Sequence, residues 1–409
     1  VTIENNTAVP DFNPMWGGVF YDSWGGGMSC ENGSNPTLQN VIIRDNIAQS
    51  GFSPNSSSSG GGIYCENSNP VFQQVEITNN SSTNISYGPA GLNCGGGIFF
   101  AGSDPMMNNV LIRANEAGSG GGIYFDNSCP DLKAVTISNN LAALKGGGIF
   151  ISSSIPDFDS IHRSNIFFNT SLTTGNDLFS DTVINVIVDT FTVLNPTPYH
   201  AEPLAMYSFD ILNGKRAQIN ADLYVSPEGD NSNSGLTPND PLKNIRFAFA
   251  IILADSLHQH TIHLLNGTYG DSTNNEILPL NIPDFVNLDG EEKDSVILDA
   301  SSKPGALAVN NNISNQIRHL TITGAYNDGI SINGSDPEFS GITITNCQNG
   351  IICDSSSPTI DSITIVNKTG SGFFCTNNSN PYVSHSQFAS NLDFGVRCEN
   401  NSNPVLKNV

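Results

Sequence analysis

Short segments that alternate between apolar and polar residues recur along the chain, each introduced by glycines and followed by a proline. In one copy, Gly60-Gly61-Gly62-Ile63-Tyr64-Cys65 leads to Asn69-Pro70 and then to Val75-Glu76-Ile77-Thr78-Asn79-Asn80. Similar blocks begin at Gly25, Gly95, Gly120 and Gly146. A period of two predicts short strands, one after the glycines and one at each V-x-I segment. Nothing in the block has the periodicity of a helix.

The spacing of the prolines gives the length of the repeat. In the first array they are Pro36, Pro70, Pro105, Pro130 and Pro156, in steps of 34, 35, 25 and 26 residues. The two longer steps carry insertions, Ile47 to Ser59 and Ser81 to Cys94. In a second array, from Gly329 onward, the prolines step by 21, 23 and 23 residues and are Pro337, Pro358, Pro381 and Pro404. Insertions confined to one point of a repeat indicate loops on one face of a solenoid.

The repeat length and the strand pattern together predict a fold class. One repeat is too small to bury its own apolar face, so the repeats must stack, at about 4.8 Å per coil. Strand-to-strand crossings of this kind are right-handed in nearly all proteins. We therefore predict an all-β fold, a right-handed parallel β-helix with two tandem arrays and one short capping helix.

The same patterns predict the domain boundaries. Residues 1–180 form the first array, 181–221 the closing strands and a linker, and 222–409 the second array. Within the last of these, 241–256 is expected to form a helix that covers the open end of the second β-helix. Asp240 and Pro241 suit its cap and its first position. Its apolar stripe consists of Leu242, Ile245, Phe249 and Ile252.

Particular residue types have expected roles in a stacked coil. The glycine runs suit a tight corner. Asparagines recur where strands end, and their amides are expected to hydrogen-bond along a column, with members Asn46, Asn80, Asn115 and Asn140. A second column, expected in the interior, contains Cys30, Cys65, Phe100, Phe125 and Ile151, and its counterpart in the second array contains Cys353, Cys375 and Cys398. We expect these thiols to be reduced and buried.

Charge and composition exclude several classes of function. The chain has 15 Lys+Arg against 38 Asp+Glu, a formal net charge of −23. Nucleic-acid binding needs clustered Lys and Arg, and an anionic membrane surface would repel this chain. The longest apolar run, from Phe247 to Ala254, is far shorter than the roughly 20 residues of a membrane span. The 8 cysteines are too few for a disulfide-rich scaffold of this length.

One segment has the form of a calcium-binding loop. Asp230, Ser232 and Ser234 place oxygen-bearing side chains at alternate positions before Gly235, as a hard cation requires. The twelfth position is Pro241 instead of the usual glutamate. The segment therefore predicts either a Ca²⁺ site, the one cofactor the sequence suggests, or an ordinary polar turn.

A histidine cluster offers a second candidate metal site. His258 and His260 would share a face of an extended strand, whereas His263 would not. Zinc needs three or four converging ligands, so a structural role is the stronger interpretation. Neither a lyase-type base beside carboxylates nor a pair of hydrolase carboxylates stands out, and we predict no catalytic residue.

The repeat also resembles known families. Its G-G-G-I block followed by I-x-x-N resembles the repeat of polymorphic outer-membrane adhesins, which shows G-G-A-I and F-x-x-N. The segment from Tyr224 to Phe247 resembles the N-terminal module that opens many secreted right-handed β-helix proteins, some of them pectate-lyase-like. These resemblances imply an extracellular or cell-surface location.

The resulting expectation is a non-catalytic structural or adhesive β-helix protein. The chain begins and ends inside a repeat, at Val1 to Asn6 and at Asn403 to Val409, so we expect a fragment of a longer surface or filament polypeptide. Expected partners are copies of itself stacked end to end, neighbouring domains of the same chain, glycans or a cell surface, and no nucleic acid. The alternative is a lyase-like polysaccharide-active enzyme or a carbohydrate-binding β-helix.

Overall fold

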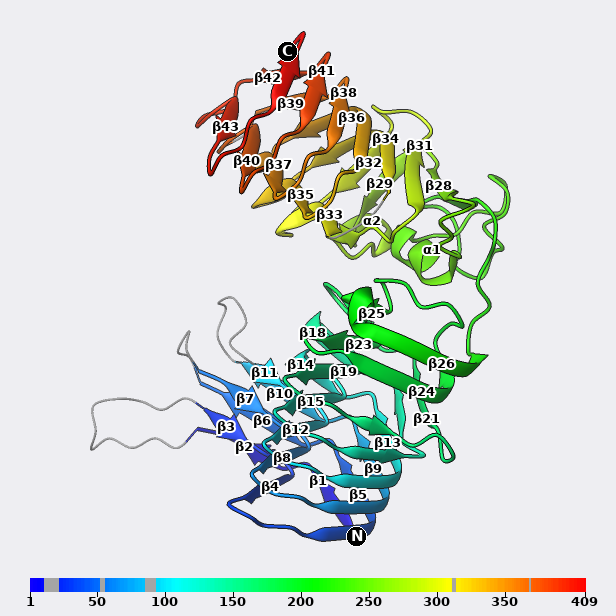
Figure 1. The fold of residues 1–409 in the computed structure, drawn as a ribbon, viewed down its shortest axis with the longest axis vertical. Helices are drawn as coiled ribbons and strands as arrows, with labels where there is room; N and C mark the ends of the chain where they lie inside the picture. Colours follow the sequence, from blue (N-terminus) through cyan, green and yellow to red (C-terminus); the bar gives the residue numbers. More distant parts are fainter. Residues whose placement is uncertain (11–21, 52–55, 85–92, 311–313, 368) are drawn as a thin grey trace, which may run out of the picture. The chain divides into compact units, whose positions relative to one another are not determined.

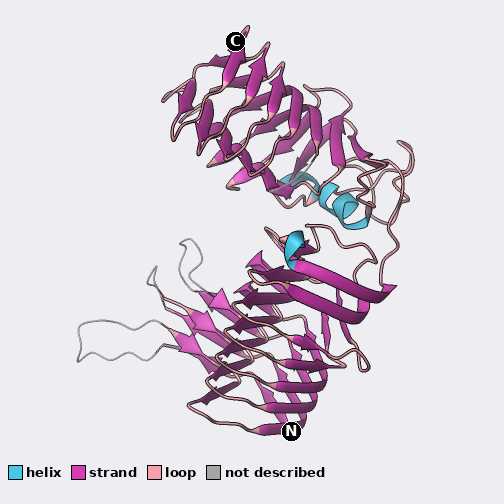
Figure 2. Cartoon of the chain, viewed as in Figure 1, coloured by secondary structure: helices cyan, strands magenta, loops and turns pink. Residues whose placement is uncertain are grey.

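The chain folds into two stacks of parallel β coils. The computed structural model describes residues 1–10, 22–51, 56–84, 93–310, 314–367 and 369–409. Contacts divide the chain into two compact units, Val1–Ala217 and Gln218–Val409. In the described residues the first unit holds three parallel sheets and the second unit holds two (Figures 1 and 2).

The three sheets of the first unit have ten, nine and seven strands in the described residues. The ten-stranded sheet contains β1 (Thr2–Glu4), β5 (Thr37–Arg44), β9 (Val71–Thr78), β13 (Met106–Arg113), β16 (Asp131–Lys133), β17 (Thr136–Ser138), β20 (Asp157–Phe158), β21 (Ser164–Phe167), β24 (Ile184–Phe191) and β26 (Tyr207–Gly214). The nine-stranded sheet contains β2 (Thr7–Ala8), β3 (Ser23–Trp24), β6 (Ile47–Ser50), β7 (Ser58–Ser59), β10 (Ser81–Asn84), β11 (Asn93–Cys94), β14 (Glu116–Ser119), β18 (Leu141–Lys145) and β22 (Thr170–Ser171). The seven-stranded sheet contains β4 (Met28–Glu31), β8 (Ile63–Glu66), β12 (Ile98–Ala101), β15 (Ile123–Asp126), β19 (Ile149–Ser152), β23 (Leu178–Ser180) and β25 (Ala201–Glu202). A 3-10 turn, η1, spans Leu204–Met206.

The second unit has a twelve-stranded and a six-stranded sheet within the described residues. The twelve-stranded sheet contains β27 (Leu223–Val225), β28 (His260–Leu264), β29 (Gly267–Gly270), β31 (Val286–Gly290), β32 (Val296–Asp299), β34 (Gln316–Thr323), β36 (Glu338–Thr345), β38 (Thr359–Asp361), β39 (Thr364–Val366), β41 (Tyr382–Ser384), β42 (Gln387–Ala389) and β44 (Val405–Lys407). The six-stranded sheet contains β30 (Leu280–Asn281), β33 (Gly305–Asn310), β35 (Asp328–Asn333), β37 (Asn349–Asp354), β40 (Phe373–Thr376) and β43 (Val396–Cys398). The two helices are α1 (Ile245–Ile251) and α2 (Asp271–Asn274).

Equivalent positions of successive coils stack directly on one another, which confirms the predicted interior column. Phe100 pairs with Cys65 on one neighbouring strand and with Phe125 on the other, and Phe125 pairs with Ile151. All four side chains are fully buried. Each column therefore continues a core that no single coil could build. In the second unit Cys353 and Cys375 are buried in the same way, whereas Cys398, on the terminal strand β43, is exposed.

The coils of the first unit up to β22 have one more strand than the sequence pattern indicates. The predicted strands lie in the ten-stranded and seven-stranded sheets, but the segment after each asparagine forms the nine-stranded sheet. Its strands, such as Ser81–Asn84 and Glu116–Ser119, are rich in small polar residues and lack apolar alternation. They extend because the neighbouring coils supply hydrogen-bonding partners. Parts of the two predicted insertions, 52–55 and 85–92, lie outside the described residues.

The glycine runs form the corner that leads into the seven-stranded sheet, as predicted. Gly60 has φ +69°, a conformation that residues with a Cβ rarely adopt. At the next position the constraint is space, because a Cβ on Gly61 would lie 2.4 Å from the carbonyl oxygen of Gly96. The third glycine, Gly62, leaves room for the side chain of Asn80, which a Cβ would approach to 3.0 Å.

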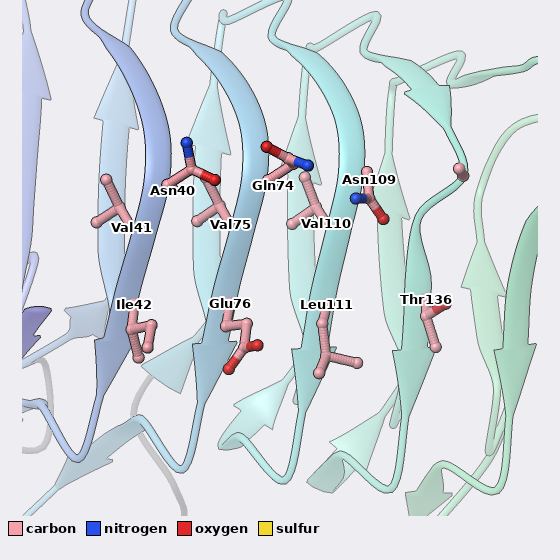
Figure 3. Close-up of a pocket in the computed structure, with 11 residues that line it drawn as sticks. Asn40, Val41, Ile42, Gln74, Val75, Glu76, Asn109, Val110, Leu111 and Thr136 are labelled. Carbon is pink, nitrogen blue, oxygen red and sulfur yellow. The ribbon is translucent and has the colours of Figure 1, made fainter. Parts of the chain in front are cut away.

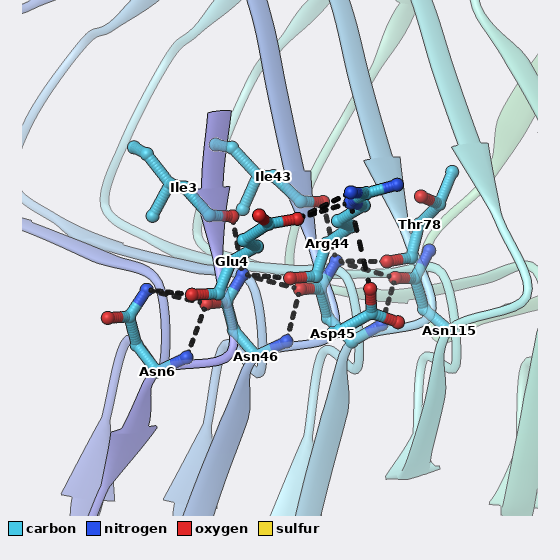
Figure 4. Close-up of polar contacts among 10 residues, drawn as sticks. Ile3, Glu4, Asn6, Ile43, Arg44, Asp45, Asn46, Thr78 and Asn115 are labelled. Carbon is cyan, nitrogen blue, oxygen red and sulfur yellow. Dashed lines mark hydrogen bonds and ion pairs between the residues drawn. The ribbon is translucent and has the colours of Figure 1, made fainter. Parts of the chain in front are cut away.

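The asparagines form a continuous hydrogen-bonded column, as predicted (Figure 4). In each, the backbone N–H and the side-chain Nδ2 both donate to Oδ1 of the asparagine in the next coil, at N···O distances of 2.9 to 3.1 Å. The column runs through Asn46, Asn80, Asn115, Asn140 and Asn169. Because all of these amides are buried, each depends on its neighbours for partners.

A second polar column, which we did not predict, is made of serines. In the first unit the backbone N–H of Ser68 donates to the hydroxyl of Ser103, and that of Ser103 donates to the hydroxyl of Ser128. The second unit repeats the arrangement at Ser356 and Ser379. The sequence signal is a serine two positions before each repeat proline.

The asparagine column ends on a buried carboxylate. Asp177 lies in the block that begins at Gly175, at the position that holds the third glycine in the earlier blocks. Its Oδ1 accepts both donors of Asn169 at 3.1 and 3.0 Å. Burial raises the pKa of Asp177 to about 7, although hydrogen bonds from Thr192 and Asn169 and the charge of Arg216 favour the ionised form. The column thus ends on a group that titrates near neutral pH.

The helix of the second unit is shorter than predicted and is capped by another residue. It spans Ile245–Ile251, not 241–256, because Leu242 pairs with Val225 as a β-bridge and Asp240 binds Ser234 instead of capping the helix. The carboxylate of Glu276 accepts the N–H groups of Ile245 and Arg246 at 2.6 and 3.1 Å. The predicted apolar stripe is buried, and the helix contacts β27, the strand that ends the twelve-stranded sheet.

We expect the asparagine column to dominate the stability of the first unit. Asn80→Ala removes the acceptor of the buried backbone N–H of Asn46, whereas Nδ2 of Asn46 keeps the carbonyl oxygens of Ile3 and Arg44. We expect a cost of about 3 kcal/mol. Urea unfolding followed by tryptophan fluorescence measures this cost, because both tryptophans, Trp16 and Trp24, belong to the first unit. The control Asn108→Ala, on the exposed face of β13, should change stability by less than about 0.5 kcal/mol. Equal effects of the two substitutions would contradict this role for the column.

We expect Asp177 to make the first unit less stable as the pH rises. Its folded pKa is about 7, against about 3.9 in an unfolded chain, so folding takes up a proton between these values. The stabilisation is complete below about pH 4 and is lost as the pH rises toward 7, by about 4 kcal/mol. Asp177→Asn should remove this loss, so urea unfolding at pH 8 should find the variant more stable than the parent. The difference should shrink at pH 5, and a difference independent of pH would disprove the assignment.

Candidate functional site

The long strands of the ten-stranded sheet bend in the middle, and the bend creates an outward hollow. Asn40, Gln74 and Asn109 lie at the same position of β5, β9 and β13 and have φ values of 54°, 56° and 54°. A left-handed residue inside a strand turns its direction, and the stacked coils align these turns into a groove (Figure 3). The groove has a volume of about 390 Å³.

The lining of this groove suits binding better than chemistry. Its first row consists of the exposed amides Asn40, Gln74 and Asn109, and its second row contains the aliphatic side chains of Ile42 and Leu111 beside the exposed carboxylate of Glu76 (Figure 3). Amides both donate and accept hydrogen bonds, and the aliphatic groups offer apolar contact. The described lining residues include no histidine, lysine or cysteine, and Glu76 is the single carboxylate among them.

The predicted calcium loop forms two hydrogen-bonded turns. Oδ1 of Asp230 accepts the backbone N–H of Ser232 at 2.8 Å. Hydrogen bonds from the backbone and the side chain of Ser232 lower the pKa of Asp230. The hydroxyl of Ser234 instead donates to Oδ2 of Asp240 at 2.7 Å. The described residues contain no group of three His, Cys, Asp or Glu side chains placed to hold a metal ion. The Ca²⁺ assignment to Asp230, Ser232 and Ser234 stays a prediction.

Two of the three clustered histidines share a partner, because His260 and His263 each lie 3.6 Å from a carboxylate oxygen of Asp222. Nδ1 of His258 lies 3.1 Å from Asp255, and Nε2 of His260 lies 2.7 Å from Oδ1 of Asn220. His263 stacks on Tyr224 with ring centroids 4.9 Å apart and lines a second hollow in the twelve-stranded sheet. That hollow also contains His319 and Asp289, which sequence reasoning missed because they are far from His263 along the chain.

Arginine beside the asparagine column serves a structural ion pair. Arg44 lies 2.6 Å from the carboxylate of Glu4 in the neighbouring strand, and both side chains are largely exposed (Figure 4). Such exposed pairs contribute about 0 to 1 kcal/mol.

The residues that line the groove were not predicted from the sequence. The sequence signal for them is the pair of polar residues that breaks the alternation within each long strand, such as Asn108-Asn109.

Comparisons with known proteins identify the fold family. Residues 291–409 match the right handed beta helix region, and residues 134–152 match the Chlamydia polymorphic membrane protein repeat. The chain is a right-handed β-helix repeat protein. No curated protein matches it. Among its described residues, no helix has the length and apolar character to cross a bilayer.

One solved structure similar to this β-helix protein is a PL6 family alginate lyase, AlyGC. The two are 10% identical, the similarity covers 95% of this chain and 86% of the other, and the TM-score is 0.24.

Proposed function

We propose that this chain is a non-catalytic, extracellular surface protein that attaches to its ligand through the groove of the ten-stranded sheet. The observation that carries the proposal is the match of residues 134–152 to a repeat of polymorphic membrane proteins. That segment includes β17, which lies in the same sheet and contributes Thr136 to the groove. The matched repeat is therefore part of the structure that forms the groove.

The chemistry of the groove favours an uncharged ligand. Its rows of amide and aliphatic side chains can hydrogen-bond and pack against a neutral polar surface such as a glycan. Glu76 adds a negative charge, and the chain as a whole carries −23. An anionic polymer would therefore be repelled. A groove repeated coil by coil also suits an extended ligand better than a compact one.

We expect a charge placed in the groove to weaken attachment. Leu111→Lys puts an ammonium group in the second row, where a docked ligand would have to desolvate it, and should weaken binding about tenfold or more. Beads coated with the 409-residue chain and counted on cultured epithelial cells, together with an array of neutral and acidic glycans, measure the effect. The matched control is Ala101→Lys, which adds the same charge on β12 in the seven-stranded sheet.

Three results would overturn the proposal. The first is attachment of the parent chain no stronger than that of albumin-coated beads, and the second is an equal loss of attachment in both lysine variants. The third is release of an unsaturated product from alginate or polygalacturonate, followed by its ultraviolet absorbance, which would favour the enzymatic alternative.

A further inference from the structure

The second unit has a pocket of its own, independent of the groove in the first unit. Its volume is about 400 Å³, within the usual range for small-ligand sites. It lies where β27, β28, β31 and β34 stack. The groups that give it chemical character are Tyr224, His263, Asp289, Glu291 and His319.

One side of the pocket is a carboxylate held by an imidazole of the next coil. Nδ1 of His319 lies 2.8 Å from Oδ1 of Asp289. His319 occupies the bend of β34 with φ 52°. At the following bend stands Gly341, where a Cβ would come within 3.0 Å of Cδ2 of His319. The glycine therefore leaves the far edge of the imidazole uncovered by a side chain.

The other side presents an aromatic pair and a second carboxylate. The ring of His263 stacks on Tyr224 with an interplanar angle of 23°. The carboxylate of Glu291 is positioned by the backbone N–H of Asn266, which donates to Oε2 at 3.2 Å. Asp289 and Glu291 each use one oxygen in these bonds, so each retains acceptor capacity for a ligand.

The charge of the pocket selects the sign of its ligand. Two carboxylates and no lysine or arginine stand among the described residues that line it. Arg318 is the cross-strand partner of Asp289 but is not part of the lining, and no ion pair between them occurs in the described structure. An anion is excluded by repulsion, and a cation would be attracted by the local carboxylates as well as by the net charge of −23.

We propose that this pocket binds an organic cation, a ligand ending in an ammonium or guanidinium group. Such a group can donate charge-assisted hydrogen bonds to Asp289 and Glu291 while its apolar stem packs against Tyr224. An inorganic cation is a poorer fit, because the described side chains include no cluster with metal-binding geometry. The two sources of this chemistry are a basic side chain of a partner protein and a free polyamine.

The chain contains a matched control for this pocket. Asp361 occupies the same strand position as Asp289, three coils along the same sheet, and Oδ1 of Asp361 lies 2.8 Å from Nδ1 of His385. Each pair thus joins an aspartate to the bend histidine of the next coil. Neither Asp361 nor His385 lines the pocket. Removing the charge of either aspartate disturbs its contact with the bend histidine, and Asp361 also accepts the hydroxyls of Ser384 and Ser362. Only Asp289 faces the proposed ligand.

Titration calorimetry of the 409-residue chain tests the proposal with N-acetyl-arginine amide and spermidine as cationic probes. N-acetyl-citrulline amide is the uncharged isostere of the first. We expect the arginine probe to bind at least about tenfold more tightly than the citrulline probe. Asp289→Asn should reduce this preference, because Glu291 is then the one carboxylate left among the described lining residues, and Asp361→Asn should leave it unchanged. Tighter binding of spermidine than of the arginine probe would identify a polyamine as the source, and the reverse would identify a basic side chain.

Three outcomes would overturn the proposal. They are equal affinity for the arginine and citrulline probes, equal effects of the two aspartate substitutions, and no saturable binding of either cationic probe. Circular dichroism spectra and thermal unfolding of both variants separate these outcomes from a failure to fold. Loss of adhesion through the first-unit groove would not affect this test, because the two sites share no residue.

Discussion

The in-register stacking of equivalent residues is the constraint on which the whole structure depends. Successive coils place similar residues at equivalent positions. The contacts of a residue therefore come mainly from the equivalent residues in the coils on either side of it. For the buried amides this is decisive, because Asn80 has its acceptor in Asn115 and is itself the acceptor for Asn46. A buried amide without such neighbours would be a large penalty, whereas a column of them is satisfied along its length.

Stacking acts on the outer surface as well as in the core. Six aromatic rings stack in sequence, with centroids 4.5 to 5.8 Å apart. The first is Trp24 of β3 in the nine-stranded sheet, and the other five belong to the seven-stranded sheet and are Tyr64, Phe99, Tyr124, Phe150 and Phe179. The ammonium of Lys145 lies 4.4 Å from the centroid of the last ring. Because these rings pack face to face along the coil axis, their faces are used within the column. This surface therefore contributes stability and offers mainly ring edges to the solvent.

The repeating features of the fold could be predicted from the sequence, and the features that break the repeat could not. The corners, strands and polar column could be predicted because their sequence signals recur in successive repeats. These signals are the glycine runs, the V-x-I segments and the asparagines. Glu276 caps the helix from about thirty residues away, which no local pattern encodes. The strands of the nine-stranded sheet, such as Ser81–Asn84, have no apolar alternation of their own and are extended by their neighbours. The role of Asp177 could not be predicted for a related reason, because an aspartate replaces the glycine in a single block.

The same reasoning explains why the candidate sites lie at the bends of the long strands. In a straight parallel strand, side chains point alternately into the core and onto a flat outer surface. A left-handed residue interrupts this alternation, as at Gln74 in the first unit and His319 in the second. The bend both hollows the surface and releases a position whose identity the core does not restrict. In the first unit these positions hold mostly amides, which suit an uncharged ligand. In the second unit two of them hold histidines, each bound to an aspartate of the preceding coil. One scaffold can thus carry surfaces of different chemistry, because residues at its bends vary without disturbing the columns that hold the coils together.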